Sequence, residues 1–186
     1  FTFLVLILPF SGGVECLKTQ RPGMHLLRGA CVVFANTCFF ISLATLSLAN
    51  AVAIFFISPL VVTVLSVIFL RETVGIHRWS ATLFGLLGVI IIVRPVSAAF
   101  QVASLLPMLA ALGYAILNII TRRIGGTESA ATMTFYIQLT FIIVSSGVGL
   151  IVGDGQFDNG TNASLTFLLR AWKIPELGQI WILVLL

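Results

Sequence analysis

The side chains that could do chemistry in this sequence are neutral and polar, and they lie inside long apolar runs. They are Asn36, Thr37, Tyr114, Asn118, Tyr136 and Gln138. Polar groups are costly in hydrocarbon unless they are hydrogen-bonded, so we expect these to face other helices or a water-filled cavity. Taken singly, each is best explained as a hydrogen-bonding contact between helices. Taken as a set, they are the candidates for the lining of a cavity.

Motifs of catalysis are missing from the sequence. It has no GxxxxGK[ST] phosphate loop, no HExxH metal site and no GxSxG nucleophile turn. His25 and His77 fall in expected loops, far from a second metal ligand, and we interpret them as residues of the membrane interface. The three cysteines do not form the pattern of a disulfide framework and are interpreted as small packing residues. We therefore predict no enzymatic activity, no catalytic residue, no metal and no cofactor.

Two prolines, Pro59 and Pro107, are expected to interrupt apolar spans. A proline removes one helical hydrogen bond and crowds the carbonyl four residues before it, here that of Phe55 or Ala103. Helices broken in this way line the substrate path in transporters, whereas a static kink held by neighbouring helices is the alternative. Phe55 and Pro59 therefore join the cavity candidates.

Composition defines the surroundings of these residues. Of the 186 residues, 59% are hydrophobic and 9% are charged, and the mean hydropathy is +1.15. Globular domains carry about 25% charged residues, so this chain cannot build a water-soluble surface. The net charge of +4 is confined to loops between apolar runs. We interpret it as a topology signal rather than as a nucleic-acid surface.

Five apolar runs are about long enough to cross a bilayer, which needs about 20 helical residues. They are Gly29–Ser47, Asn50–Leu70, Trp79–Arg94, Val102–Thr121 and Ala130–Val152. The third of them is the shortest and the least secure. Apolar half-spans at 1–10 and 179–186 flank them, so we expect an internal fragment of a longer protein. The predicted fold is an all-α, polytopic membrane helix bundle.

The Lys and Arg residues fall unevenly on the two sides of these spans. Seven share one side, namely Lys18, Arg21, Arg28, Arg71, Arg78, Arg122 and Arg123. Three fall on the other, namely Arg94, Arg170 and Lys173. Because cytoplasmic loops collect positive residues, the loops at 71–78 and 122–128 are predicted to be cytoplasmic. The segment 153–175 is then predicted to face outward.

An ordered set of motifs extends over Leu48–Pro95. A span with a central Ser-Pro and a closing Glu is followed by a short loop and by a Gly-rich span that ends in Arg-Pro. The residues concerned are Ser58, Pro59, Glu72, Gly85, Gly88, Arg94 and Pro95. This order resembles the end of an EamA domain of the drug/metabolite transporter superfamily. The segment Tyr114–Ser129 is similar to the start of a second such domain.

The resemblance implies a ten-helix transporter made of two five-helix repeats of opposite orientation (5+5). Residues 1–95 would form the C-terminal part of the first EamA repeat, from the end of helix two to helix five. Residues 96–186 would form the N-terminal part of the second, with helices six, seven and the start of eight. The implied activity is secondary transport of a small organic metabolite or drug-like solute by alternating access. The implied location is a bacterial inner membrane.

Glu72 is expected at the cytoplasmic mouth, where Arg71, Arg78 or a helix N-terminus could hold it. We favour a structural latch there over a gating or coupling carboxylate. The cavity candidates suit an amphipathic solute such as an amino acid derivative, a nucleoside or a vitamin. Expected partners are this small-molecule substrate and the lipid bilayer, with no nucleic acid, and the sequence leaves a homo-oligomer open. The rival function is that of a non-transporting membrane scaffold or assembly protein.

Overall fold

The fold is known from a computed structural model that describes residues 18–19, 21–93, 102–152 and 166. Several predictions concern other parts of the chain. These are the two half-spans, almost all of the outer segment 153–175, and the basic residues Arg94, Arg170 and Lys173. They lie outside the described residues.

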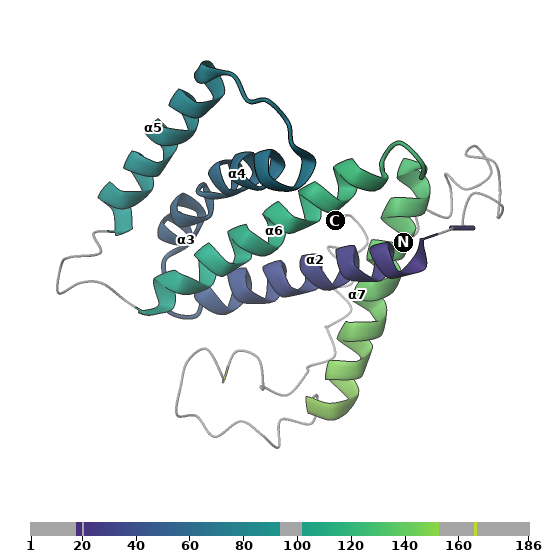
Figure 1. The fold of residues 1–186 in the computed structure, drawn as a ribbon. Helices are drawn as coiled ribbons and strands as arrows, with labels where there is room; N and C mark the ends of the chain where they lie inside the picture. The colour runs from purple at the N-terminus through teal and green to yellow at the C-terminus, as the bar shows by residue number, and fades with distance from the viewer. Residues whose placement is uncertain (1–17, 20, 94–101, 153–165, 167–186) are drawn as a thin grey trace.

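Helices form nearly all of the described part of the chain (Figure 1). In chain order they are α2 (Pro22–Ser42), α3 (Leu48–Phe55), α4 (Ser58–Leu70), α5 (Ile76–Val93), the 3₁₀ helix η3 (Val102–Ser104), α6 (Leu105–Ile124) and α7 (Ala130–Val152). Within the described residues, four segments are long and apolar enough to cross a membrane: α2, α3 with α4, α6 and α7. The apolar part of α5, Ile76–Ile91, is shorter than that, as expected of the third span. The predicted all-α membrane bundle is confirmed.

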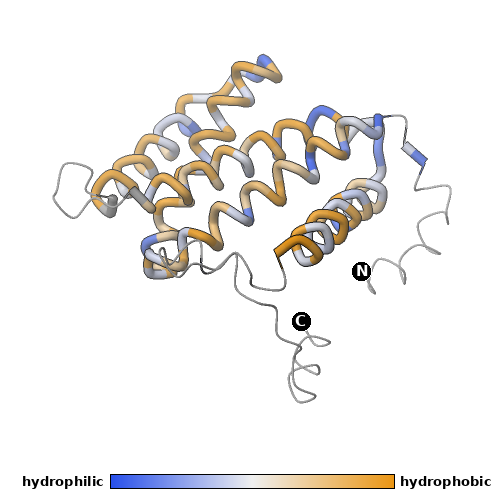
Figure 2. The backbone as a smooth tube through the Cα atoms, turned by 90° about the horizontal axis from the view of Figure 1, so that it is seen from below, coloured by the Kyte–Doolittle hydropathy of each residue, from blue (hydrophilic) through white to orange (hydrophobic). Residues whose placement is uncertain are grey.

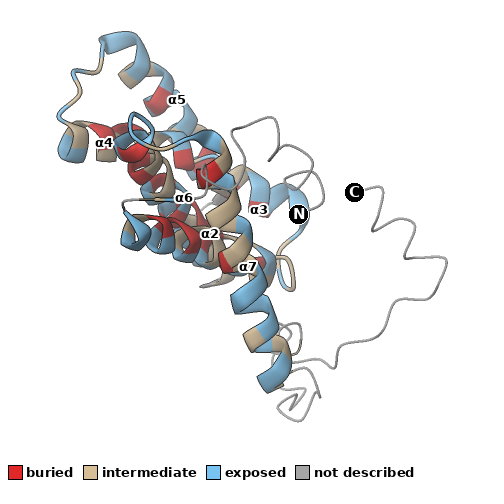
Figure 3. Ribbon diagram, turned by 90° about the vertical axis from the view of Figure 1, so that its right-hand side faces the viewer, coloured by how far each residue is buried: buried red, intermediate tan, exposed pale blue. Residues whose placement is uncertain are grey.

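Helix α6 lies at the centre of the bundle, between α2 and α4, while α7 crosses α2 and α5 lies on the far side of α4 (Figure 1). The buried face at the centre of α6 carries small residues, and Ala110, Ala111 and Ala115 are fully buried. Small side chains let helix backbones approach closely, which suits packing between helices in lipid. Buried residues accordingly gather on α2, α4 and α6, whereas α5 and α7 contain few of them (Figure 3).

Large apolar side chains cover the outside of the bundle. Phe84 is 73% exposed, Leu150 is 87% exposed and Ile151 is 72% exposed. Hydrophobic residues extend along the helices, and hydrophilic residues gather toward helix ends (Figure 2). Exposed apolar surface on this scale is unfavourable in water and is ordinary against lipid. The surface therefore indicates a multi-pass membrane protein.

The second predicted span is broken where Pro59 was expected to interrupt it. Helix α3 ends at Phe55 and α4 begins at Ser58, which places Pro59 in the first turn of the new helix. A proline fits there because the N–H that it lacks has no helical acceptor. Pro107 also lies in a first turn, that of α6. The predicted interruption at Pro107 is therefore wrong, since the helix starts beside it.

Helix α2 begins at Pro22, earlier than the predicted start of the first span at Gly29. Proline is favoured in the first turn of a helix because its backbone angle is already helical. The earlier start places His25 and Arg28 inside the helix, where they are 0% and 5% exposed. The interpretation of His25 as a loop residue of the interface is therefore wrong. So is the prediction that Arg28 belongs to a loop.

The end of α4 positions Glu72. Arg71 adopts a left-handed backbone conformation with φ of 54°, and the N–H of Glu72 donates to the carbonyl of Ser66 at 3.4 Å. A left-handed residue just after a helix is a common way to end it and turn the chain away. Glu72 thereby reaches the C-terminal end of α6.

Candidate functional site

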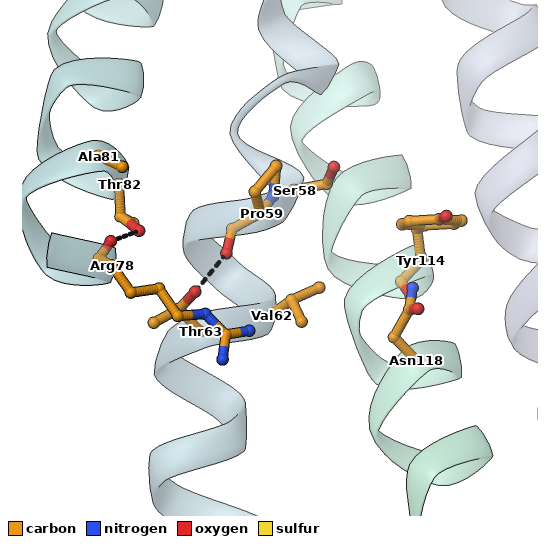
Figure 4. Close-up of a pocket in the computed structure, with 9 residues that line it drawn as sticks. All are labelled: Ser58, Pro59, Val62, Thr63, Arg78, Ala81, Thr82, Tyr114 and Asn118. Carbon is orange, nitrogen blue, oxygen red and sulfur yellow. Dashed lines mark hydrogen bonds between the residues drawn. The ribbon is translucent and has the colours of Figure 1, made fainter. Parts of the chain in front are cut away.

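A cavity of about 330 Å³ lies where α4, α5 and α6 face one another (Figure 4). Its lining residues are Ser58, Pro59, Val62 and Thr63 from α4, Arg78, Ala81 and Thr82 from α5, and Tyr114 and Asn118 from α6. The cavity thus begins at the break between α3 and α4. Small-molecule sites span about 300 to 1,000 Å³, so this volume is at the lower end of that range.

Three polar side chains of the lining are held by bonds within their own helices. The Thr63 hydroxyl donates to the Pro59 carbonyl at 2.8 Å, and the Thr82 hydroxyl donates to the Arg78 carbonyl at 2.6 Å (Figure 4). The Asn118 amide donates to the Tyr114 carbonyl at 2.8 Å. A hydroxyl oxygen can still accept a bond, and an amide has a second N–H and a carbonyl oxygen. These groups can therefore bind a polar solute without losing their present bonds.

Among the described residues that line the cavity, Arg78 is the one with a charge. Its side chain extends from α5 toward Val62 on α4 (Figure 4). A guanidinium is a planar group with five N–H donors and suits carboxylate, phosphate and other oxygen acceptors. The cavity therefore combines a cation, hydroxyl groups and an amide.

Aromatic rings continue from the cavity toward α2. The ring centroids of Tyr114 and Phe55 are 5.6 Å apart, and those of Phe55 and Phe39 are 5.5 Å apart. Tyr114 is 43% exposed, so part of its ring is open to a ligand. Such rings can pack against a flat apolar or heteroaromatic group.

The structure separates the predicted site residues into two groups. Pro59, Tyr114 and Asn118 line the cavity, and Phe55 contacts Tyr114. Asn36, Thr37, Tyr136 and Gln138 lie elsewhere on α2 and α7. The Asn36 amide donates to the carbonyl of Val32 at 3.0 Å, and Thr37 and Gln138 are exposed. A role in binding stays a prediction for all eight residues.

Sequence reasoning missed Thr63, Thr82 and Arg78 as lining residues. A signal for them was present, because the lining occurs as pairs four residues apart. The pairs are Pro59 with Thr63, Arg78 with Thr82, and Tyr114 with Asn118. Residues four apart lie on the same face of a helix, so three helices each direct one such pair at the cavity.

Glu72 is held by Arg122, in the last turn of α6, and not by the predicted Arg71, Arg78 or helix N-terminus. The Arg122 Nη1 donates to both carboxylate oxygens, at 3.0 and 3.4 Å. The two side chains are 37% and 40% exposed. Exposed pairs contribute about 0 to 1 kcal/mol, so this contact is weak. It joins residues 1–95 to residues 96–186.

A buried cation, Arg28, connects the N-terminal part of α2 to its neighbouring helices. The Arg28 Nε donates to the Thr121 hydroxyl at 3.0 Å, and its Nη1 donates to the Met133 carbonyl at 3.3 Å. These two bonds connect α2 with α6 and α7. Arg28 thus acts in packing, and its partners explain why a charged side chain can lie within the first helix.

Several bacterial proteins are similar to this chain. A riboflavin transporter of Vibrio cholerae is 34% identical over 180 residues, which cover 95% of this chain and 59% of that protein. An S-adenosylmethionine uptake transporter of Rickettsia bellii is 34% identical over 143 residues, covering 76% of this chain and 49% of that protein. A pseudopaline exporter of Pseudomonas aeruginosa is 27% identical over 183 residues, covering 97% of this chain and 63% of that protein. No solved structure matches the chain.

The chain therefore spans about half to three fifths of the length of these curated relatives. Its membrane-length helices and bacterial relatives support a multi-pass protein of a bacterial inner membrane. Residues 1–94, half of the chain, match the family described as EamA-like transporters. The match includes α2 to α5 and the Ser-Pro, Glu and Gly positions from which the resemblance was stated. The chain belongs to the EamA-like transporter family.

Proposed function

We propose that this chain is part of a permease that moves a small organic metabolite across the membrane by alternating access. The observation that carries the proposal is the cavity at the break between α3 and α4, with Arg78, Tyr114 and Asn118 in its lining. The family and the names of the relatives favour a permease over an enzyme and over a non-transporting scaffold. Broken helices beside a solute site are typical of secondary transporters.

The proposed solute is a polar metabolite with a flat heteroaromatic ring. Riboflavin and S-adenosylmethionine, named for two relatives, each contain such a ring system. Tyr114 and Phe55 would pack against the ring. Asn118 would bond to polar atoms of the solute, and Arg78 would bond to an oxygen acceptor. This assignment accounts for the combination of aromatic and polar groups in one cavity.

The proposed movement separates two halves of the structure at one end. Residues 1–95 and 96–186 are taken as the parts of two inverted repeats, and the Glu72–Arg122 pair joins them. Opening of that end would break the pair. An exposed pair worth at most about 1 kcal/mol suits a contact that must form and break in each cycle. Glu72 is therefore proposed as a structural latch.

Uptake into proteoliposomes tests the transport function. The full-length protein is tested with radiolabelled riboflavin, S-adenosylmethionine, a nucleoside and an amino acid derivative under several ion gradients. We expect uptake of at least one solute above empty liposomes. If no solute moves under any gradient, transport is wrong and the scaffold function is favoured.

Two substitutions of Tyr114 test the role of its ring. Tyr114→Ala removes the ring, whereas Tyr114→Phe keeps it and is the matched control. Stacking of a base on an aromatic side chain is worth about 1 to 3 kcal/mol, so Tyr114→Ala should raise KM by about fivefold or more. Tyr114→Phe should change KM less than about threefold. Equal KM values for the two variants would contradict stacking on Tyr114.

A further inference from the structure

His25 is enclosed at the junction of α2 and α7. Its side chain is 0% exposed, and its ring stacks on that of Tyr136 with centroids 4.7 Å apart and an interplanar angle of 26°. Neither ring nitrogen has a hydrogen-bond partner among the described residues. Oε2 of Glu128 lies 3.6 Å from Nε2 of His25. A fully buried imidazole thus faces a carboxylate without a completed hydrogen bond.

Glu128 is fixed in this position from its other side. Its side chain is 7% exposed, and its Oε1 accepts a bond of 2.7 Å from the Thr19 hydroxyl. Oε2 is left facing the imidazole. Buried carboxylates are favourable only when paired or hydrogen-bonded, so a charged partner for Oε2 would stabilise this arrangement.

The other charged groups near this junction are occupied or exposed. On α2, Arg28 bonds to Thr121 and Met133, and Arg21 just before the helix is exposed. Lys18, next to Thr19, is exposed as well. On α6, Arg122 is paired with Glu72, and Arg123 is exposed. Helix α7 contains no Asp, Glu, Lys or Arg between Ala130 and Val152. Of the charges in the described ranges, the Glu128 carboxylate is therefore the one that faces His25.

We propose that His25 and Glu128 form a proton-binding site that closes the end of the bundle where α2 meets the α6–α7 connection. A proton from water binds the neutral imidazole and gives an imidazolium, whose Nε2–H then donates to Oε2 of Glu128. Charge-assisted N–H···O bonds are about 2.7 to 2.9 Å long, so the 3.6 Å separation shortens when the proton is bound. Loss of the proton returns a neutral ring and a weaker contact.

Burial makes this site depend on conformation. His25 belongs to residues 1–95 and Glu128 to residues 96–186, so the contact joins the same two halves as the Glu72–Arg122 pair. An imidazole that is 0% exposed cannot exchange its proton with water until the two halves separate. A proton would bind in the open arrangement and be enclosed in the closed one. If the bound proton drives the movement of a solute, it is the coupling ion of the permease. That part of the inference rests on the proposed function.

Distances between spin labels at Gly23 and Gly126 test the proposal. Both positions are exposed, and an added Cβ meets nothing within 4 Å at either, so cysteines fit there. All native cysteines of the full-length protein, among them the three of this chain, are replaced by alanine. The protein is then measured in lipid between pH 8 and pH 6. Histidine ordinarily changes charge in this range. A charged hydrogen bond exceeds a neutral one by about 1 kcal/mol, so the ratio of short to long distances should rise about fivefold as the pH falls.

The two histidines of the chain provide a matched pair of variants. His25→Gln should remove the dependence on pH, whereas His77→Gln, at an exposed position in the first turn of α5, should keep it. Glu128→Gln leaves the imidazole in place and should reduce the response, which guards against misfolding of the first variant. The proposal is overturned if the wild type shows no response or if the response is lost in His77→Gln. It is also overturned if the response survives in His25→Gln or keeps its full size in Glu128→Gln.

Failure of this inference can be told apart from failure of the proposed function. Solute uptake that is unchanged by pH and by His25→Gln would reject proton coupling and keep the permease. A pH-dependent distance that requires His25, in a protein that moves no solute, would reject the permease and keep the proton site.

Discussion

Replacing Gly29 by alanine should weaken the contact between α2 and α7 on which the His25–Tyr136 stack depends. Gly29 is buried, and a Cβ there would overlap the Thr140 side chain, lying 2.5 Å from its Cβ and 2.7 Å from its Cγ2. Overpacking of this kind costs about 1 to 3 kcal/mol. Three atoms of Thr140 overlap the added Cβ, which places the cost at about 3 kcal/mol. Alanine regains about 1 kcal/mol of helix propensity. The expected net loss in the free energy of unfolding is about 2 kcal/mol.

Two further variants make this prediction specific. Gly85→Ala in α5 is the matched control, because an added Cβ there meets nothing within 4 Å and only the helix propensity changes. It should stabilise by up to about 1 kcal/mol. Thr140→Gly removes every atom that overlaps. Combined with Gly29→Ala, it should restore about 3 kcal/mol relative to the sum of the single variants, because the steric cost disappears and the gain in helix propensity remains.

The assay is reversible unfolding by sodium dodecyl sulfate in mixed micelles, followed by helix content. If Gly29→Ala is as stable as Gly85→Ala, the two helices do not touch at this point. If the double variant shows no coupling between the two sites, the loss has another origin. Either result would refute the reasoning from close packing.

Three smaller effects on stability follow from the helix ends and are measured by the same unfolding assay. Arg71→Gly should stabilise the protein by about 1 kcal/mol, because glycine adopts the left-handed conformation of this position freely. The control Arg123→Gly in α6 should destabilise it by about 1 kcal/mol. The reverse order would contradict strain at Arg71. Glu72→Gln should lower the free energy of unfolding by less than about 1 kcal/mol, because the pair with Arg122 is exposed. High salt should abolish the difference between variant and wild type, and a larger, salt-independent loss would contradict an exposed pair. Ser47→Ala should cost about 1 kcal/mol by removing the side chain that accepts the Asn50 N–H at 3.3 Å; an unchanged stability would exclude the cap.

The membrane helices could be predicted because lipid selects for long apolar runs, and the helices found follow those runs closely. The start of α2 could not be predicted in this way, because the apolar run begins only after His25 and Arg28, whereas the helix begins before them. They are tolerated within α2 through partners far along the chain. Arg28 bonds to Thr121, and His25 stacks on Tyr136. The one local sign of the earlier start was Pro22.

The cavity was predictable in part. Tyr114 and Asn118 are polar residues in an apolar run, which marks them without any structure. Arg78 carries no such mark, because a basic residue near a helix end is equally expected as a topology signal. Its place in the lining depends on how α5 packs against α4. The fully buried state of His25 likewise depends on tertiary packing that the sequence around it does not encode.

The most direct test of a solute site between α4, α5 and α6 compares two asparagines in the uptake assay. Asn118 and Asn36 each donate to the carbonyl four residues earlier, at 2.8 and 3.0 Å, but Asn118 alone of the two lines the cavity. Asn118→Ala should lower kcat/KM for the transported solute by about five- to tenfold, the loss of one or more hydrogen bonds. If this cavity is the site, Asn36→Ala should leave kcat/KM within about twofold, contrary to the sequence-based prediction that Asn36 also binds the solute. Equal losses in the two variants, or a loss with Asn36→Ala alone, would contradict a site in this cavity.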